Sequence, residues 1–152
     1  MGNYKVKCAV GKRGIATKKK EGDLITPKGK FKIKYILYRK DRVYSLKTKI
    51  KKIIIKKDMG WCNDSASQKY NKLIRFPSRY SAEKLYRSDN SYDIILVLDF
   101  NFKPIIKGKG SAIFIHVAKK NYKKTAGCIA LQKKDLRNLI KIINTKTIIY
   151  IN

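Results

Sequence analysis

The single histidine and one of the three cysteines stand close enough in the sequence to form a nucleophile–base pair. His116 lies near the end of an apolar run, and Cys128 follows it twelve residues later. A thiolate is a strong nucleophile, but an ordinary cysteine is mostly protonated at neutral pH, and a neighbouring imidazole can take that proton. The pair therefore predicts cysteine acyl-transfer chemistry, with Cys128 as nucleophile and His116 as base.

The loop between these two residues favours the same chemistry. Gly127 lets the backbone approach closely, so amide groups near Cys128 can face an oxyanion. Four lysines of the loop carry positive charges that we expect to lower the thiol pKa, namely Lys119, Lys120, Lys123 and Lys124. The alternative interpretation is a structural histidine beside a packed, unreactive cysteine.

Other catalytic motifs and metal sites are poorly represented. The ten acidic residues are scattered, no Gly-x-Ser-x-Gly motif occurs, and residues 108–110 lack the strand–loop–helix context of a phosphate-binding loop. A zinc site would need nearly every Cys and His of the chain, so we expect no metal. Cys8, Cys62 and Cys128 can close at most one disulfide.

Apolar runs predict the elements that position the pair. Residues 31–38 alternate between apolar and polar positions, which indicates a half-buried strand. Residues 93–98 and 111–117 hardly alternate and predict strands buried on both faces. The remaining predicted elements are strands at residues 53–55 and 147–151, a helix over residues 133–143 and a helical turn around residues 82–86. We expect a single, mainly β, sandwich-like domain over residues 1–152 with one helix near the C-terminus.

The charge of the chain is strongly unbalanced. Its 38 Lys and Arg residues face 10 Asp and Glu residues, which gives a formal net charge of +28. Lysine dominates together with isoleucine, asparagine and tyrosine, a pattern that compositional drift explains better than a selected nucleic-acid surface. We therefore expect weak, salt-dependent binding to anionic polymers and no specific nucleic-acid partner.

The sequence also lacks the usual apolar targeting segments. No apolar run reaches the length of a transmembrane helix. Residues 1–8 lack the apolar core of a secretory signal. We expect no transmembrane segment.

Two separated stretches resemble the L,D-transpeptidase catalytic domain family (YkuD-like), bacterial enzymes of peptidoglycan cross-linking. The first runs from Gly11 to Phe31 and includes a Thr-Pro-x-Gly-x-Phe motif that begins at Thr26. The second contains His116 followed by Thr-x-Gly-Cys at residues 125–128. Residues 61–64, 70–71 and 92–93 are similar to a short, single-domain branch of the family.

The resemblance implies a β-sandwich of mixed sheets and a cysteine transpeptidase that needs no cofactor. Cys128 would attack the carbonyl of the third residue of a peptidoglycan stem peptide, expel the terminal D-Ala and pass the acyl group to an amine. His116, oriented by a backbone carbonyl, would serve first as base for the thiol and then for the amine. Thr125 and Gly127 would position the nucleophile or the oxyanion.

Two departures from the family pattern concern substrate binding. Ala126 stands where the family commonly has His, and Ala130 stands where it commonly has Arg. The candidate replacements for that Arg are Arg79, Arg87 and Lys123. A hydrolytic endopeptidase or carboxypeptidase with the same dyad, and a non-enzymatic module that binds anionic polymers, remain alternatives. The family implies a cell-envelope or periplasmic location and a role in cell-wall biogenesis and cell shape.

Overall fold

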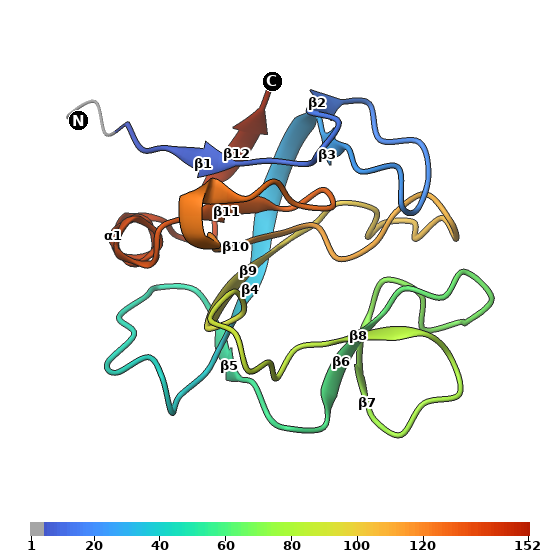
Figure 1. The fold of residues 1–152 in the computed structure, drawn as a ribbon, viewed down its shortest axis with the longest axis horizontal. Coiled ribbons are helices and arrows are strands. Elements are labelled where there is room, and N and C mark those ends of the chain that lie inside the picture. The colour runs from blue at the N-terminus through green and yellow to red at the C-terminus, as the bar shows by residue number, and fades with distance from the viewer. Residues whose placement is uncertain (1–4) are drawn as a thin grey trace.

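The structure is a computed structural model that describes residues 5–152. Residues 1–4 lie outside the described residues. They include the start of the segment, residues 1–8, that is predicted to lack the core of a secretory signal. Strands make up 32% and helices 9% of the structure, which has mixed sheets, one α-helix near the C-terminus and the arrangement of a β-sandwich (Figure 1). The predicted fold class is therefore confirmed.

Seven strands form the main sheet, in which β10 and β11 run parallel at the centre of the candidate site. The sheet order is β1 (Cys8–Ala9), β11 (Ile129–Leu131), β10 (Phe114–Val117), β9 (Ile94–Leu98), β4 (Gly29–Tyr38) and β12 (Ile148–Ile151), with β5 (Lys52–Ile54) also paired to β4. The sheet is mixed, because β5 is parallel to β4 while β12 and β9 are antiparallel to it.

Strand β9 divides its side chains between two hydrophobic clusters. Ile94, Leu96 and Leu98 belong to one cluster, whereas Ile95 and Val97 belong to the other. This split follows from the strand geometry, in which successive side chains point to opposite faces of the sheet. All five residues of β9 are buried, so the prediction of a strand buried on both faces is confirmed.

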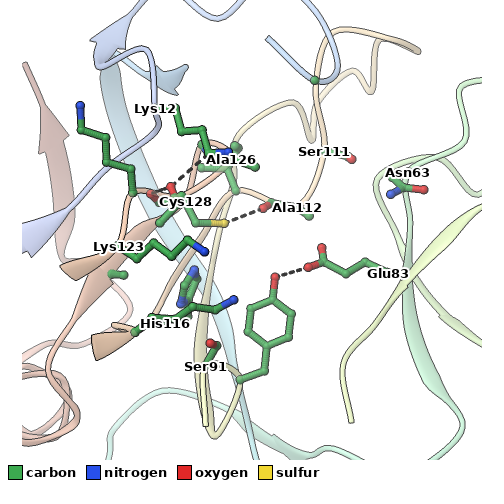
Figure 2. Close-up of a pocket in the computed structure, with 18 of the residues that line it drawn as sticks. Lys12, Asn63, Glu83, Ser91, Ser111, Ala112, His116, Lys123, Ala126 and Cys128 are labelled. Atoms are coloured by element: carbon green, nitrogen blue, oxygen red, sulfur yellow. Dashed lines mark hydrogen bonds between the residues drawn. The ribbon is translucent and has the colours of Figure 1, made fainter. Parts of the chain in front are cut away.

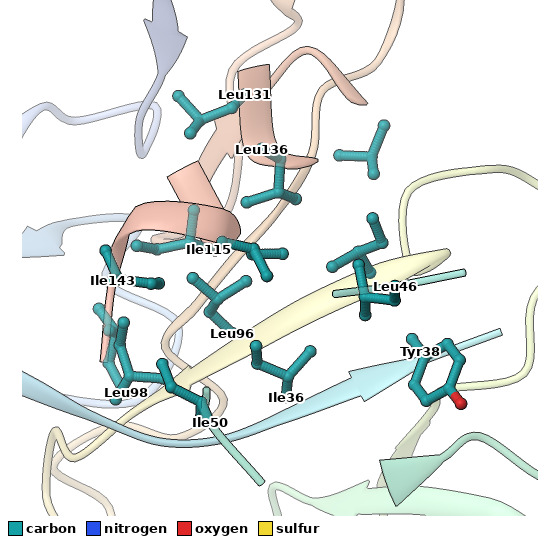
Figure 3. Close-up of a cluster of buried hydrophobic side chains, with 14 of the residues drawn as sticks. Ile36, Tyr38, Leu46, Ile50, Leu96, Leu98, Ile115, Leu131, Leu136 and Ile143 are labelled. Atoms are coloured by element: carbon teal, nitrogen blue, oxygen red, sulfur yellow. The ribbon is translucent and has the colours of Figure 1, made fainter. Parts of the chain in front are cut away.

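The helix α1 (Lys133–Ile142) covers one of these faces. Its fully buried residues Leu136 and Ile140 belong to the same cluster as Leu96 and Ile115, and Figure 3 shows Leu136 beside Ile115. Asp135 lies in the first turn, where a carboxylate suits the positive end of the helix dipole. The predicted helix thus ends one residue later than the observed one.

A second sheet, drawn at the lower right of Figure 1, lies on the opposite side of the main sheet. It consists of β7 (Leu73–Arg75), β6 (Met59–Cys62) and β8 (Ala82–Lys84). Trp61 of β6 meets the ring of Phe114 edge-on, with ring centroids 5.1 Å apart. The prediction of a helical turn around residues 82–86 is wrong, because Glu83 pairs with Trp61 in an antiparallel ladder that overrides the local helical preference.

Two further elements flank the site. Strands β2 (Ile15–Ala16) and β3 (Thr26–Pro27) form a two-stranded parallel sheet, and η1 (Lys120–Tyr122) is a short 3-10 turn in the loop before Cys128. The strand predicted over residues 111–117 begins only at Phe114, because Ala112 has a positive φ of 54°. Within residues 5–152, no helix is both long and apolar enough to span the bilayer.

The loop between β2 and β3 is held by a buried ion pair. Lys18 Nζ lies 2.5 Å from Asp23 Oδ1, and the two side chains are 3% and 4% exposed. Burial pushes the pKa of the Asp23 carboxyl upward, but the Lys18 ammonium and the amides of Lys19, Ile25 and Lys20 outweigh it and lower this pKa from 3.8 to about 2.

We expect Asp23→Asn to lower the free energy of unfolding by ~2 kcal/mol at pH 7. Because the carboxyl pKa is lower in the folded state, its contribution is complete above about pH 4 and is lost as the pH falls through about 2. Urea unfolding at pH 7 and at pH 2.5 measures this deficit, which should shrink at the lower pH. Asp58→Asn, which removes an exposed pair with Arg75, is the matched control and should change little. A deficit of equal size at both pH values would contradict the assignment.

Candidate active site

The sheet register places Cys128 and His116 on the same face of the main sheet. In the parallel pair of β10 and β11, His116 lies opposite Ala130, and Cys128 precedes Ala130 by two residues. Side chains two residues apart in extended backbone share a face, and the amide of Phe114 accordingly donates to Cys128 Sγ at 3.4 Å. Both residues line one cavity of about 610 Å³ (Figure 2).

The imidazole of His116 is held by the backbone of the next residue. Its Nδ1 lies 3.0 Å from the carbonyl oxygen of Val117, and its ring packs edge-on against Tyr92 at 5.3 Å. The contact with a carbonyl requires Nδ1 to carry the proton, which leaves Nε2 as an acceptor. Burial lowers the pKa of His116, and the charges of Arg87 and Lys119 lower it further, whereas the Val117 carbonyl raises it. The ring is therefore neutral at pH 7.

The sulfur of Cys128 is a protonated thiol in this structure. Sγ donates a hydrogen bond to the carbonyl oxygen of Ala112 at 3.1 Å, which Figure 2 shows as a dashed line. Burial raises the pKa of the Cys128 thiol to about 12, and the nearby Glu83 raises it as well. The resting arrangement is a thiol bound to Ala112 and a neutral imidazole bound to Val117, which line the same cavity and share no hydrogen bond among the described residues.

The loop lysines do not lower the thiol pKa as expected from the sequence. The groups that lower it are the Phe114 amide and Lys18, a buried residue of the β2–β3 loop, and burial outweighs both. Lys119, Lys120, Lys123 and Lys124 are exposed, so water screens their charges, and Lys119 acts on His116 instead. Proximity in sequence was a poor guide to which cation faces the sulfur.

Thr125 fixes the loop that carries Cys128. Its Oγ1 donates to the Cys128 carbonyl at 2.6 Å and accepts from the Gly127 amide at 3.1 Å. Its backbone pairs with the chain near Gly11, where the Thr125 amide donates to Val10 and the Lys12 amide donates to Thr125. Thr125 thereby ties the loop that carries Cys128 to the N-terminal segment.

Gly127 allows a close approach that no other residue would permit. Its φ is +143°, and a Cβ at this position would lie 2.9 Å from the carbonyl oxygen of Ile25. Its amide is bound to Thr125, and among the loop hydrogen bonds of residues 5–152 none uses the amide of Cys128. Of these two amides, that of Gly127 is thus engaged by a side chain, whereas that of Cys128 has no partner among these bonds of the described residues.

The three candidate substrate-binding cations lie in different places. Arg79 is exposed, stacks on Tyr80 and lines a separate cavity, so the structure does not bring it to the site. Arg87 lines the site but pairs with Asp89 at 2.8 Å and lies 3.8 Å from Glu83. Lys123 lines the site and is exposed.

Sequence reasoning missed the polar wall across the cavity from Cys128 (Figure 2). The Tyr92 hydroxyl donates to Glu83, and burial raises the pKa of the Glu83 carboxyl. Glu21 accepts hydrogen bonds from the Tyr70 hydroxyl at 2.6 Å and from Ser111 at 2.8 Å. Tyr70 and Tyr92 belong to the motifs that resemble the family branch, whereas Glu83 lies in the predicted helical turn and in none of these motifs.

The site contains no group of metal-ligating side chains. Among residues 5–152, no three His, Cys, Asp or Glu side chains lie close enough together to hold a metal ion. All three cysteines are free thiols: Cys8 is exposed, Cys62 is buried and Cys128 is intermediate.

Comparison with protein families gives a match that covers nearly the entire chain. Residues 2–151 match the YkuD family, described as L,D-transpeptidase catalytic domain. No curated protein and no solved structure matches the chain. The mainly β fold with mixed sheets agrees with this match. The chain therefore belongs to the YkuD family of L,D-transpeptidase catalytic domains.

Proposed function

We propose that this chain is a single catalytic domain that acts as a cysteine-dependent L,D-transpeptidase on peptidoglycan stem peptides in the cell envelope. Membership of the YkuD family implies a peptidoglycan substrate. The observation that carries the finer assignment is the shared cavity, in which Cys128 and His116 face the same side and the Val117 carbonyl orients the imidazole.

In the first half of the reaction, Nε2 of His116 takes the thiol proton and Sγ attacks the carbonyl carbon of the third stem residue. The negative charge that develops on the carbonyl oxygen is stabilised by the Cys128 amide. The carbon–nitrogen bond then breaks, His116 returns its proton to the leaving amine, and D-Ala departs. A thioester to Cys128 remains.

In the second half, an amine of a neighbouring stem replaces D-Ala. His116 takes a proton from the amine as it attacks the thioester carbonyl, and the carbon–sulfur bond breaks. The proton returns to sulfur, which regenerates the thiol. If water attacks the thioester in place of the amine, the reaction is the hydrolytic alternative. Which of the two reactions occurs depends on how well the acceptor position excludes water.

Lys123 is the proposed anchor for the substrate carboxylate in place of the Arg that the family commonly carries. Arg87 is engaged by Asp89 and Glu83, whereas Lys123 is exposed at the cavity and has no ion pair among the described residues. A free ammonium can meet a carboxylate without first breaking another pair. Three further exposed lysines line the same cavity, namely Lys12, Lys119 and Lys124.

Incubation with purified disaccharide-tetrapeptide tests the proposed function. We expect mass spectrometry to show released D-Ala together with cross-linked dimers, and exchange of the terminal residue when a second D-amino acid is added. Disaccharide-tripeptide without dimers or exchange would assign the hydrolytic activity instead. Intact substrate, together with salt-sensitive polymer binding that survives Cys128→Ala, would contradict both and support a binding module.

A further inference from the structure

The carbonyl that binds the Cys128 thiol belongs to a residue in a strained conformation. Ala112 has φ of 54°, a region that residues with a Cβ adopt only at an energetic cost. Its carbonyl oxygen accepts the thiol hydrogen bond at 3.1 Å. A conformation of this kind persists only when the surrounding structure holds it.

The group that holds Ala112 is the side chain of Asn71, which is 2% exposed. Its Oδ1 accepts from the Ala112 amide at 3.1 Å and from Trp61 Nε1 at 2.9 Å. Its Nδ2 donates to the carbonyls of Phe100 at 3.1 Å and Asn101 at 3.0 Å. Both donor and both acceptor positions of the Asn71 side chain are therefore used, which fixes its orientation. The fixed Oδ1 in turn holds the backbone amide of Ala112.

We propose that the Ala112 carbonyl holds Cys128 as a thiol before substrate binds, and that Asn71 is the positioning residue that aims this carbonyl at Sγ. The inference rests on the proposed function, because it describes how the assigned nucleophile is kept unreactive before substrate arrives. A carbonyl oxygen accepts from S–H but repels a thiolate, so the contact favours the protonated form.

Release of this contact is part of the first catalytic step. The S–H hydrogen bond to Ala112 breaks, the proton passes to Nε2 of His116, and the sulfur becomes free to attack. The Phe114 amide, which already points at Sγ, stabilises the thiolate during this transfer. An unloaded enzyme thus presents a neutral thiol, which oxidants and adventitious electrophiles attack slowly.

Other groups near the sulfur also affect the pKa of the Cys128 thiol. Glu83 of β8 raises the pKa of the thiol, whereas Lys18 and the Phe114 amide lower it. His116 of β10 and Tyr92 lie in the same cavity. None of these groups contacts Asn71 through a hydrogen bond, so Asn71→Gly removes no direct hydrogen bond to them.

Iodoacetamide labelling, with each cysteine quantified by peptide mass spectrometry, tests the role of Asn71. Asn71 has φ of 56°, so glycine preserves its backbone, and Asn71→Gly deletes only the side-chain contacts. We expect Cys128 in this variant to be labelled about fivefold faster at pH 7.5, the effect of losing one ordinary hydrogen bond. The labelling rate of the exposed Cys8 measures the activity of the reagent. Labelling of the buried Cys62 would show that the structure has opened locally.

Asn101→Gly serves as the control. It makes the same replacement at φ of 54°, and Asn101 contacts Ile106 and Gly110 but not Ala112. This variant should not speed the labelling of Cys128. An unchanged rate in Asn71→Gly with Cys62 protected, or an equal increase in Asn101→Gly, overturns the proposal.

The S–H stretching band of the unmodified thiol gives a second measurement, which decides the question if Asn71→Gly exposes Cys62. The infrared difference between the wild type and Cys128→Ala isolates this band. We expect it at neutral pH and at lower frequency than the band of exposed Cys8, whereas a missing or unshifted band contradicts the proposal. Both measurements use the empty protein, so they can succeed even if stem peptides prove not to be substrates.

Discussion

Cys128→Ala is expected to abolish transpeptidation and leave the fold intact. In the proposed mechanism the sulfur forms the thioester, and alanine offers no nucleophile, so turnover should fall by at least ~10³-fold. Cys128 lies at the edge of a hydrophobic cluster that contains Trp61 and Phe114, and the smaller side chain removes only the sulfur from that contact. Release of D-Ala from disaccharide-tetrapeptide measures the loss, and circular dichroism with urea unfolding checks the fold.

The matched control for this substitution is Cys8→Ala, which changes an exposed cysteine of β1 outside the cavity. It should retain wild-type turnover. Cys62→Ala should likewise retain the chemistry, although it removes a buried side chain and is expected to lower stability. Turnover that survives Cys128→Ala but not Cys62→Ala would contradict the proposed role of Cys128 and would point to Cys62 as the nucleophile.

His116→Ala is expected to be nearly as damaging as Cys128→Ala. The thiol pKa of about 12 means that little thiolate exists at neutral pH without a base. If thiol and imidazole act as a unit, as the proposed mechanism requires, the double variant should lose no more than the worse single variant. Steady-state D-Ala release from the three variants measures this non-additivity. Losses that multiply in the double variant would show that the two residues act independently.

The pH profile gives a separate check on His116. Burial lowers the pKa of its imidazole from 6.5, so the base is neutral at pH 7 and becomes protonated only at lower pH. Turnover should therefore not change as the pH is lowered from 7.5 to about 6.5. It should fall only at lower pH, where the imidazole becomes protonated. A profile whose acid limb lies above pH 7 would contradict a neutral imidazole. Tyr92→Phe, which keeps the ring contact with His116, is the control for packing.

The elements that hold the site differ in how well the sequence predicts them. The run at residues 93–98 predicts β9 well, because a strand buried on both faces needs apolar residues at every position. Residues 82–84 have no such pattern, and their three-residue strand exists because β6 supplies a pairing edge. Short edge strands depend on partners distant in sequence, so local preference predicts them poorly.

At the site, the sequence predicts the identity of the candidate residues better than it predicts the protonation state of the thiol. His116 and Cys128 are candidates by residue type and by the resemblance of their motifs to the family, and the structure places them at one cavity. The state of the thiol depends on burial and on Ala112, whose conformation is held by Asn71 from 41 residues away. Charge counted along the sequence therefore predicted a lowered thiol pKa, whereas the folded surroundings raise it.

The most direct test of the central claim is the location of the acyl group. Wild-type protein is mixed with disaccharide-tetrapeptide, quenched with acid during turnover and digested for peptide mass spectrometry. The account predicts a disaccharide-tripeptide adduct, a tetrapeptide less D-Ala, on the peptide that contains Cys128, with accumulation when acceptor amine is withheld. Turnover with the adduct on Cys8 or Cys62, or with no thioester on any cysteine, would contradict it.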